Sequence, residues 1–165
     1  MQIMPLAGRR ATLFLAPLNA AMAEFSIDTP LRRASFLAQV GHESGQLRYV
    51  RELASGAAYE GRADLGNVIA GDGVRFKGRG LLQVTGRANY AACGVVLGQD
   101  LLAAPQLLEA TTFACRSAGW FWQTRGLNGL ADAGDQERVT RRINGGVNGL
   151  AERLALYAAA RKVLA

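Results

Sequence analysis

The sequence predicts a compact, mainly helical domain in which a small irregular or β-containing lobe lies beside the helices, with a cleft between them. Half of the 165 residues are apolar and 19% are charged, a balance typical of a chain with a packed core and not of a disordered or collagen-like chain. Apolar residues recur at helical spacing in several segments, and a glycine-rich segment at residues 55–80 interrupts them. No segment repeats along the chain, so we expect one domain over residues 1–165.

The first expected helix lies near the N-terminus. Residues 11–23 follow two arginines and end in small residues, as a signal peptide does, but Pro17 and Asn19 interrupt the apolar run. Four apolar residues fall at helical spacing: Leu15, Leu18, Met22 and Phe25. This spacing predicts a helix packed on the core. The segment is too short and too interrupted to span a membrane, so we expect no stable membrane insertion.

A second helix is expected from Pro30 to about Ser44. Thr29 is a suitable N-cap, and proline is favoured at the first helical position. Gly45 is a natural stop, because glycine readily adopts the left-handed conformation that ends helices.

The rest of the chain alternates between glycine-rich breaks and helical patterns. The glycine-rich segment predicts loops and short strands, and one such strand would place Gln83 and Thr85 on the same face. Helical patterns return at residues 86–93, 105–124, 135–143 and 150–164. Three consecutive aromatics at residues 120–122 lie within one of these patterns, which favours core packing over stacking on a sugar or a base.

The two cysteines, Cys93 and Cys115, do not form a CxxC pair. Two buried thiols are therefore the favoured interpretation, and one disulfide is the alternative. His42 is the single histidine and would supply only one imidazole, which argues against a metal site.

The chain is basic, with 19 basic and 13 acidic residues and a formal net charge of +6. Nearly all of the cations are arginines, which bind planar carboxylate or phosphate groups through two parallel hydrogen bonds. The charge is scattered and no run is longer than two, which argues against a basic nucleic-acid-binding arm. Charge alone leaves both nucleic acid and an anionic cell wall open as partners.

Two glutamates are candidates for acid–base chemistry. Glu43 comes late on the second expected helix, and Glu52 follows beyond Gly45. On one continuous helix these residues would lie on opposite faces, whereas a break at Gly45 lets the chain fold back and bring both carboxyls to one cleft. Glycosidases use such a pair, one protonated acid and one ionised base. The alternative is a capped helix with two solvated glutamates.

Three segments together resemble the signatures of the family 19 glycoside hydrolases, the chitinase and phage-endolysin group. Residues 36–44 (FLAQVGHES) are similar to the catalytic-helix motif, and residues 76–90 (FKGRGLLQVTGRANY) are similar to the second signature. Residues 143–149 (INGGVNG), followed by Arg153, are similar to the third. The three segments occur in the family's order and extend over most of the chain.

This resemblance implies a lysozyme-like, two-lobed helical fold with a central substrate cleft. It also implies cleavage of a β-1,4 bond after an N-acetylhexosamine, with inversion and without a metal or cofactor. Glu43 matches the general acid, Glu52 is the best match for the general base, and Thr85 matches a residue that helps to hold the attacking water. The candidate substrate-binding residues are Gln83, Asn89 and Asn144, together with Tyr90 and Arg153, for which support of the cleft is the alternative role.

The chain departs from the plant chitinase pattern: it has two cysteines, no cysteine-rich chitin-binding module and a shortened loop region. Its positive charge favours an anionic polymer, because the bacterial wall carries carboxylates whereas chitin is neutral. We therefore expect a peptidoglycan-cleaving endolysin of the N-acetylmuramidase type. The alternatives are a small bacterial chitinase and a non-catalytic wall-binding module. Nothing beyond net charge suggests a nucleic-acid partner.

The endolysin interpretation carries an expected route. With no clear signal peptide, the protein is expected to accumulate as a monomer in the cytoplasm of a phage-infected or lysogenic host. It would reach the wall once a holin opens the membrane, and host lysis would follow.

Overall fold

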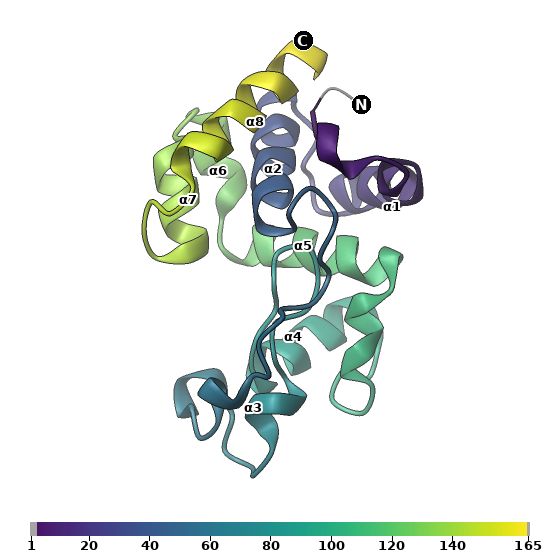
Figure 1. Ribbon diagram of the computed structural model, residues 1–165, viewed down its shortest axis with the longest axis vertical. Helices are drawn as coiled ribbons and strands as arrows, with labels where there is room; N and C mark the ends of the chain where they lie inside the picture. The colour runs from purple at the N-terminus through teal and green to yellow at the C-terminus, as the bar shows by residue number, and fades with distance from the viewer. Residues whose placement is uncertain (1–2, 165) are drawn as a thin grey trace.

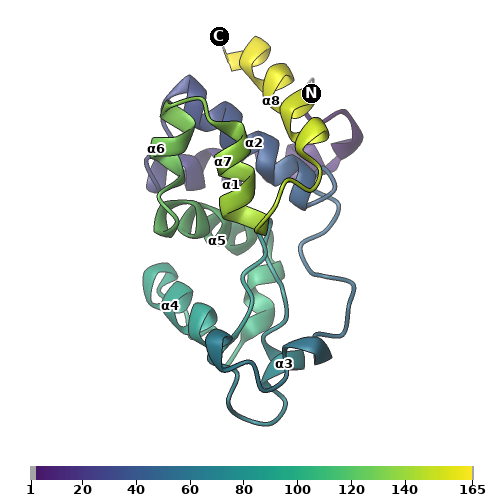
Figure 2. The ribbon, with the colours of Figure 1, turned by 90° about the vertical axis from the view of Figure 1, so that its left-hand side faces the viewer.

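The computed structural model describes residues 3–164 and shows a two-lobed, mainly helical fold (Figure 1). The large lobe contains α1, α2, α6, α7 and α8, the small lobe contains the glycine-rich segment with α3 and α4, and α5 lies between them (Figures 1 and 2). The α-helices are α1 (Arg10–Glu24), α2 (Pro30–Glu43), α3 (Asp72–Arg75), α4 (Arg87–Leu97), α5 (Thr111–Thr124), α6 (Leu127–Asp132), α7 (Gln136–Asn144) and α8 (Leu150–Leu164). The 3₁₀ turns are η1 (Pro5–Ala7), η2 (Ala57–Tyr59), η3 (Ala63–Leu65) and η4 (Pro105–Glu109). The predicted fold class is confirmed.

The N-terminal helix forms as predicted, and three of the four residues expected on its core face are buried. Phe14, Leu18 and Met22 are buried on α1, whereas Leu15 is 62% exposed. Phe25 is buried directly after the helix. The inclusion of Leu15 on the buried face was therefore wrong, because spacing of three to four residues from Leu18 also fits Phe14, and the larger aromatic ring occupies the contact with the core.

The helical patterns of the second half are confirmed with two differences. The single pattern expected over residues 105–124 is divided at Ala110, whose extended backbone separates η4 from α5. The short helix α6 was not predicted, because six residues with Gly129 among them are too few to show a helical period. No helix within residues 3–164 is both long enough and apolar enough to cross a membrane.

The small lobe is irregular, and the short strands expected in it are absent within residues 3–164. Only two isolated antiparallel bridges form, and both include Arg79, which pairs with Arg51 and with Val84. Side chains accept some of the hydrogen bonds that backbone amides would otherwise donate to a neighbouring strand. The Glu60 carboxylate accepts hydrogen bonds from two glycine amides, and the buried Asp72 carboxylate pairs with Arg87 at 2.6 Å. Its bond to Arg87 lowers the pKa of Asp72 below the ordinary value.

The aromatic and thiol side chains belong to the core, as predicted. Trp122 is fully buried and meets the Phe36 ring edge-on, with the ring centroids 5.4 Å apart. Its indole nitrogen donates to Asn128 Oδ1 at 2.8 Å. Cys93 and Cys115 are buried free thiols, and burial raises the pKa of each to about 12. The thiol interpretation is confirmed over the disulfide.

Candidate active site

Glu43 is the last residue of α2, and an arginine from α8 holds its carboxylate. The Arg153 side chain is 2% exposed, and its Nη2 donates to Glu43 Oε1 at 2.5 Å. Its Nη1 donates to Gln39 Oε1, and its Nε donates to the Asn148 carbonyl at 3.1 Å. The Glu43 side chain remains 26% exposed. Arg153 therefore fixes one carboxylate oxygen, and the carboxyl group still reaches solvent.

The chain reverses directly after α2. Gly45, Gln46 and Leu47 follow one another with positive φ angles of 56°, 56° and 69°. For the two non-glycine residues this conformation costs about 1–3 kcal/mol each. Ser44 offsets part of this cost, because its hydroxyl donates to the Val40 carbonyl and accepts from the Leu47 amide at 2.8 Å. The predicted stop at Gly45 is confirmed, and the reversal directs the chain toward Glu52.

Glu52 lies in the small lobe, on a segment that runs beside residues 78–80. The Glu52 amide donates to the Gly78 carbonyl at 3.0 Å, and the Gly80 amide donates to the Val50 carbonyl at 2.9 Å. The Glu52 Oε2 accepts from the Tyr59 hydroxyl at 2.9 Å. Its Oε1 is buried and accepts no hydrogen bond from residues 3–164. One carboxylate oxygen is thus held by Tyr59, and the other is a buried oxygen without a partner among the described residues.

Tyr59 is a suitable donor to this carboxylate. Burial, and then the neighbouring Glu52, raise the pKa of Tyr59 above its ordinary value. The hydroxyl therefore keeps the proton that it donates to Glu52.

Gly78 allows Glu52 and Gln83 to converge. A Cβ atom at Gly78 would lie 2.9 Å from Glu52 Oε2 and closer still to Gln83 Oε1. Only a residue without a side chain fits between these two oxygens. The glycines of the 76–90 segment therefore place two predicted site residues side by side, although no strand forms there.

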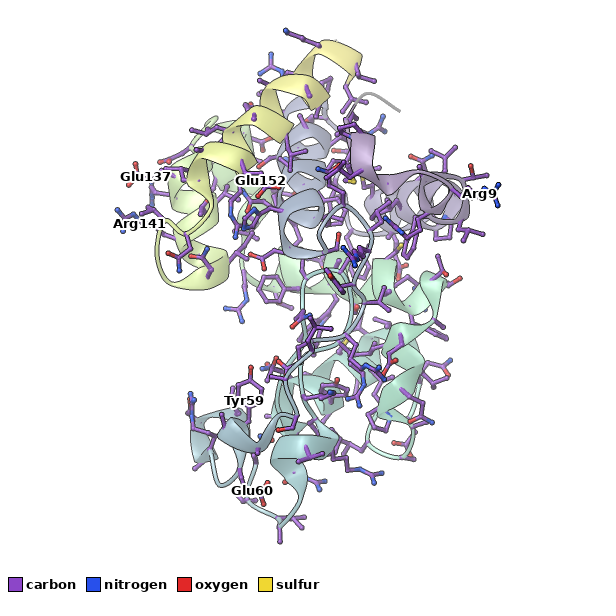
Figure 3. All side chains as sticks on the ribbon, viewed as in Figure 1. Arg9, Tyr59, Glu60, Glu137, Arg141 and Glu152 are labelled. Carbon is purple, nitrogen blue, oxygen red and sulfur yellow. The ribbon has the colours of Figure 1, made fainter. Side chains whose placement is uncertain are left out.

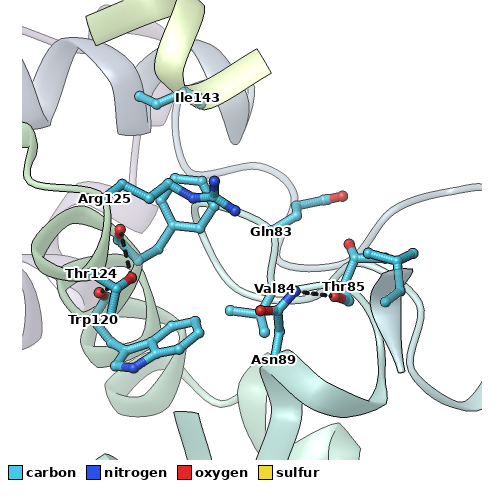
Figure 4. A pocket seen from close by; sticks show the side chains of 10 residues that line it. Gln83, Val84, Thr85, Asn89, Trp120, Thr124, Arg125 and Ile143 are labelled. Atoms are coloured by element: carbon cyan, nitrogen blue, oxygen red, sulfur yellow. Dashed lines mark hydrogen bonds between the residues drawn. The ribbon is translucent and has the colours of Figure 1, made fainter. Parts of the chain in front are cut away.

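A cavity of about 410 Å³ lies between the lobes (Figure 4). The small-lobe residues on its wall include Gln83, Thr85 and Asn89, and the opposite wall includes Trp120, Phe121, Thr124, Arg125 and Ile143. The Asn89 amide donates to the Thr85 carbonyl at 2.8 Å, which fixes its orientation. The cavity thus brings the predicted site residues Gln83, Thr85 and Asn89 close to Ile143, the first residue of the third sequence motif.

The other predicted substrate-binding residues have structural contacts. Asn144 follows Ile143 at the end of α7, where its Oδ1 accepts from the Gly146 amide at 2.8 Å and its amide donates to the Asn148 carbonyl at 3.2 Å. These bonds shape the turn whose Asn148 carbonyl accepts from Arg153.

Tyr90 is fully buried, and burial raises its pKa to about 12. Its hydroxyl donates to the Lys77 carbonyl at 2.6 Å and accepts from Arg79 at 3.0 Å. Tyr90 and Arg153 therefore support the cleft from behind and do not line the cavity.

Sequence reasoning missed two residues. Tyr59 is one aromatic in a glycine-rich segment, and its position near Glu52 in the sequence was the only signal for it. Arg125 is one arginine among many, and nothing in the sequence marked it as part of the cavity. Within residues 3–164, no three His, Cys, Asp or Glu side chains gather in a way that would hold a metal ion.

The chemistry open to this arrangement is acid–base hydrolysis. One carboxyl, Glu43, ends a helix of the large lobe, and the other, Glu52, belongs to the small lobe. Each has one oxygen held by a neighbouring side chain. Neither carboxyl is among the residues that line the cavity of Figure 4. Glycosidic bond cleavage requires a pair of carboxyl groups, one acting as acid and one as base, and these two are the candidates for that pair.

Comparisons with known proteins agree with this chemistry. Residues 18–135 match the family model described as Chitinase class I. A Haemophilus influenzae protein described as "Glycosyl hydrolase family 19 domain-containing protein" is 34% identical over 174 residues, which cover 86% of this chain and 84% of that protein. An endochitinase of Arabidopsis thaliana is 36% identical over 114 residues, 68% of this chain and 39% of the plant protein. The chain thus spans about two fifths of that plant enzyme.

Two solved structures share the fold. A bacterial family 19 chitinase has a TM-score of 0.74 and 26% identity, covering 90% of this chain and 85% of the other. A class IV chitinase from Zea mays has a TM-score of 0.73 and 27% identity, covering 94% and 80%. From the extent of these matches we conclude that the chain belongs to glycoside hydrolase family 19.

Proposed function

We propose that the protein is an endolysin that hydrolyses β-1,4 glycosidic bonds of bacterial peptidoglycan, with N-acetylmuramidase-type specificity. Its membership of family 19 supports glycoside hydrolysis. One observation favours peptidoglycan as the polymer. Among the described residues that line the cavity, Arg125 carries the only charge. A cationic wall suits a polymer that bears carboxylates better than neutral chitin.

The proposed reaction is a single displacement with inversion. The Glu43 carboxyl donates its proton to the glycosidic oxygen as the bond from that oxygen to the anomeric carbon breaks. The Glu52 carboxylate takes a proton from a water molecule, whose oxygen forms the new bond on the opposite face of the sugar. The bond from the Tyr59 hydroxyl supports this role, because it holds the Glu52 carboxylate in one orientation. Thr85 would help to hold the water, and Gln83, Asn89 and Asn144 would contact the sugars.

The test is mass spectrometry of muropeptides released from purified peptidoglycan, with the Glu43→Gln variant as control. We expect new reducing-end N-acetylmuramic acid from the wild type and none from the variant. Reducing-end N-acetylglucosamine would instead identify a glucosaminidase. Absence of any release would contradict peptidoglycan as the substrate.

The second candidate function is a small chitinase. The names of the Arabidopsis thaliana and Zea mays relatives favour it. It would appear as turnover of soluble N-acetylglucosamine oligomers with no release of muropeptides.

The proposed route has its own test. In this proposal the protein acts as a monomer, accumulates in the host cytoplasm and lyses the cell after a holin opens the membrane. Expression in a bacterial host should leave the cells intact until a holin is co-induced, and loss of culture turbidity should follow. Lysis without a holin, or cleavage and secretion near Ala23, would contradict this route.

A further inference from the structure

Arg125 is a charged side chain of the cavity wall that the proposed catalysis does not use. It follows the last residue of α5 and extends along the cavity wall toward Gln83 (Figure 4). Its guanidinium carbon lies 4.2 Å from the centroid of the Phe121 ring. Stacking on an aromatic ring restricts the guanidinium and leaves its N–H edge free for a planar anion.

Arg125 makes no ion pair with a carboxylate of residues 3–164. Other arginines around the cleft have carboxylate partners, as in the pairs Arg79–Glu109 and Arg153–Glu43. None of the ion pairs among residues 3–164 includes Arg125.

A second cation, outside the cavity lining, lies next to Arg125. Arg142, which is exposed on α7, donates from Nη1 to the Arg125 carbonyl at 3.0 Å. Partial burial, and then this neighbouring cation, lower the pKa of Arg125 below its ordinary value. The protein thus places a second positive charge close to Arg125, and a ligand carboxylate bound by Arg125 would relieve their repulsion.

We propose that Arg125 binds a carboxylate of the substrate and thereby makes the enzyme select acidic peptidoglycan over neutral chitin. The inference rests on the proposed function, because it assigns the ligand chemistry of the same cleft. Two sources carry this chemistry: the free carboxylates of a stem peptide, and the lactyl carboxylate of a muramic acid residue that bears no peptide. A guanidinium binds either group through two parallel hydrogen bonds.

The experiment compares kcat/KM of the wild type and the Arg125→Gln variant on five substrates. Two carry carboxylates: peptidoglycan with stem peptides, and glycan strands freed of peptides by an amidase. Two more are the same materials with their carboxyl groups converted to neutral methylamides, and the fifth is a soluble N-acetylglucosamine hexamer. Arg125→Lys tests the need for a planar cation. The control is Arg9→Gln, which removes the same charge from an exposed position at the start of α1 (Figure 3).

We expect Arg125→Gln to lower kcat/KM about tenfold on a carboxylated substrate, mainly through KM, which is the scale of one charge-assisted bond. On the methylamides and the hexamer the variant should equal the wild type. Arg125→Lys should be intermediate, since it provides a point charge without the planar fork. Arg9→Gln should resemble the wild type throughout. A loss on peptidoglycan with stem peptides would identify a stem-peptide carboxylate as the ligand. A loss on the peptide-free strands would identify the lactyl carboxylate.

Two outcomes would overturn the assignment of Arg125 while leaving the proposed function standing. One is an equal loss on the carboxylated and the neutralised substrates, which would show that the side chain only shapes the wall. The other is an unchanged kcat/KM on every substrate. If the wild type cleaves the hexamer but none of the peptidoglycan materials, the proposed function and the inference fail together.

Discussion

Glu43→Gln is expected to lower kcat by about 10³-fold while the protein remains folded. An amide cannot donate the proton that the leaving oxygen requires, and loss of a positioned acid commonly costs 10²–10⁴-fold, or about 3–5 kcal/mol of transition-state stabilisation. The measurement is the rate of new reducing ends from the preferred polymer. Circular dichroism melting of the same samples reports on folding.

The surroundings of Glu43 explain why the fold should persist. A glutamine at this position keeps an oxygen that accepts from Arg153, and Arg153 retains its bonds to Gln39 and Asn148. The matched control is Glu137→Gln on the exposed face of α7, where the carboxylate pairs only with Arg141 (Figure 3). This control loses the same charge and should retain full turnover. Near wild-type turnover in Glu43→Gln would end the assignment of Glu43 as the acid.

Glu52→Gln is expected to lower kcat by about 10²–10³-fold, because the attacking water then loses the base that takes its proton. Tyr59→Phe should have a smaller effect, about tenfold, because it removes one hydrogen bond to the carboxylate and leaves the carboxylate in place. Asp64→Asn is the control within the small lobe, since its exposed carboxylate bonds the Arg62 side chain and not Glu52. The same rate assay measures all three variants.

A second readout separates a base from a residue that only holds the loop. In Glu52→Ala, azide is a nucleophile that needs no base, so added azide should restore turnover. Its nitrogen would form the bond to the anomeric carbon on the opposite face, and the Glu43 proton would still go to the leaving oxygen. The product would be a glycosyl azide of inverted configuration, which NMR identifies. A loss of less than fivefold in Glu52→Gln, together with no azide product from Glu52→Ala, would move the role of the base to another residue.

Local sequence determined the longer helices and the ends of α2. Thr29 and Pro30 begin α2 as expected, and the Thr29 hydroxyl accepts from the Arg32 amide at 3.2 Å. Gly45 adopts the left-handed conformation just after the end of α2. These features depend on neighbours in sequence, which is why spacing and capping rules found them. The three motifs likewise marked Gln83, Thr85 and Asn89, which now share one cavity.

Only the tertiary structure decided which side chains meet. Arg153 lies far along the chain from Glu43, and its role in fixing that carboxylate depends on the packing of α8 against α2. The expected strand around Gln83 gave way to a single bridge, because glycines and side-chain hydrogen bonds satisfy the backbone of the small lobe without a ladder. Tyr59 and Arg125 join the site only when the lobes are in place. The sequence by itself thus determined the longer helices and the motif residues, whose patterns are local, while long-range packing and burial decided the short helix α6, the contacts and the charge of the cleft.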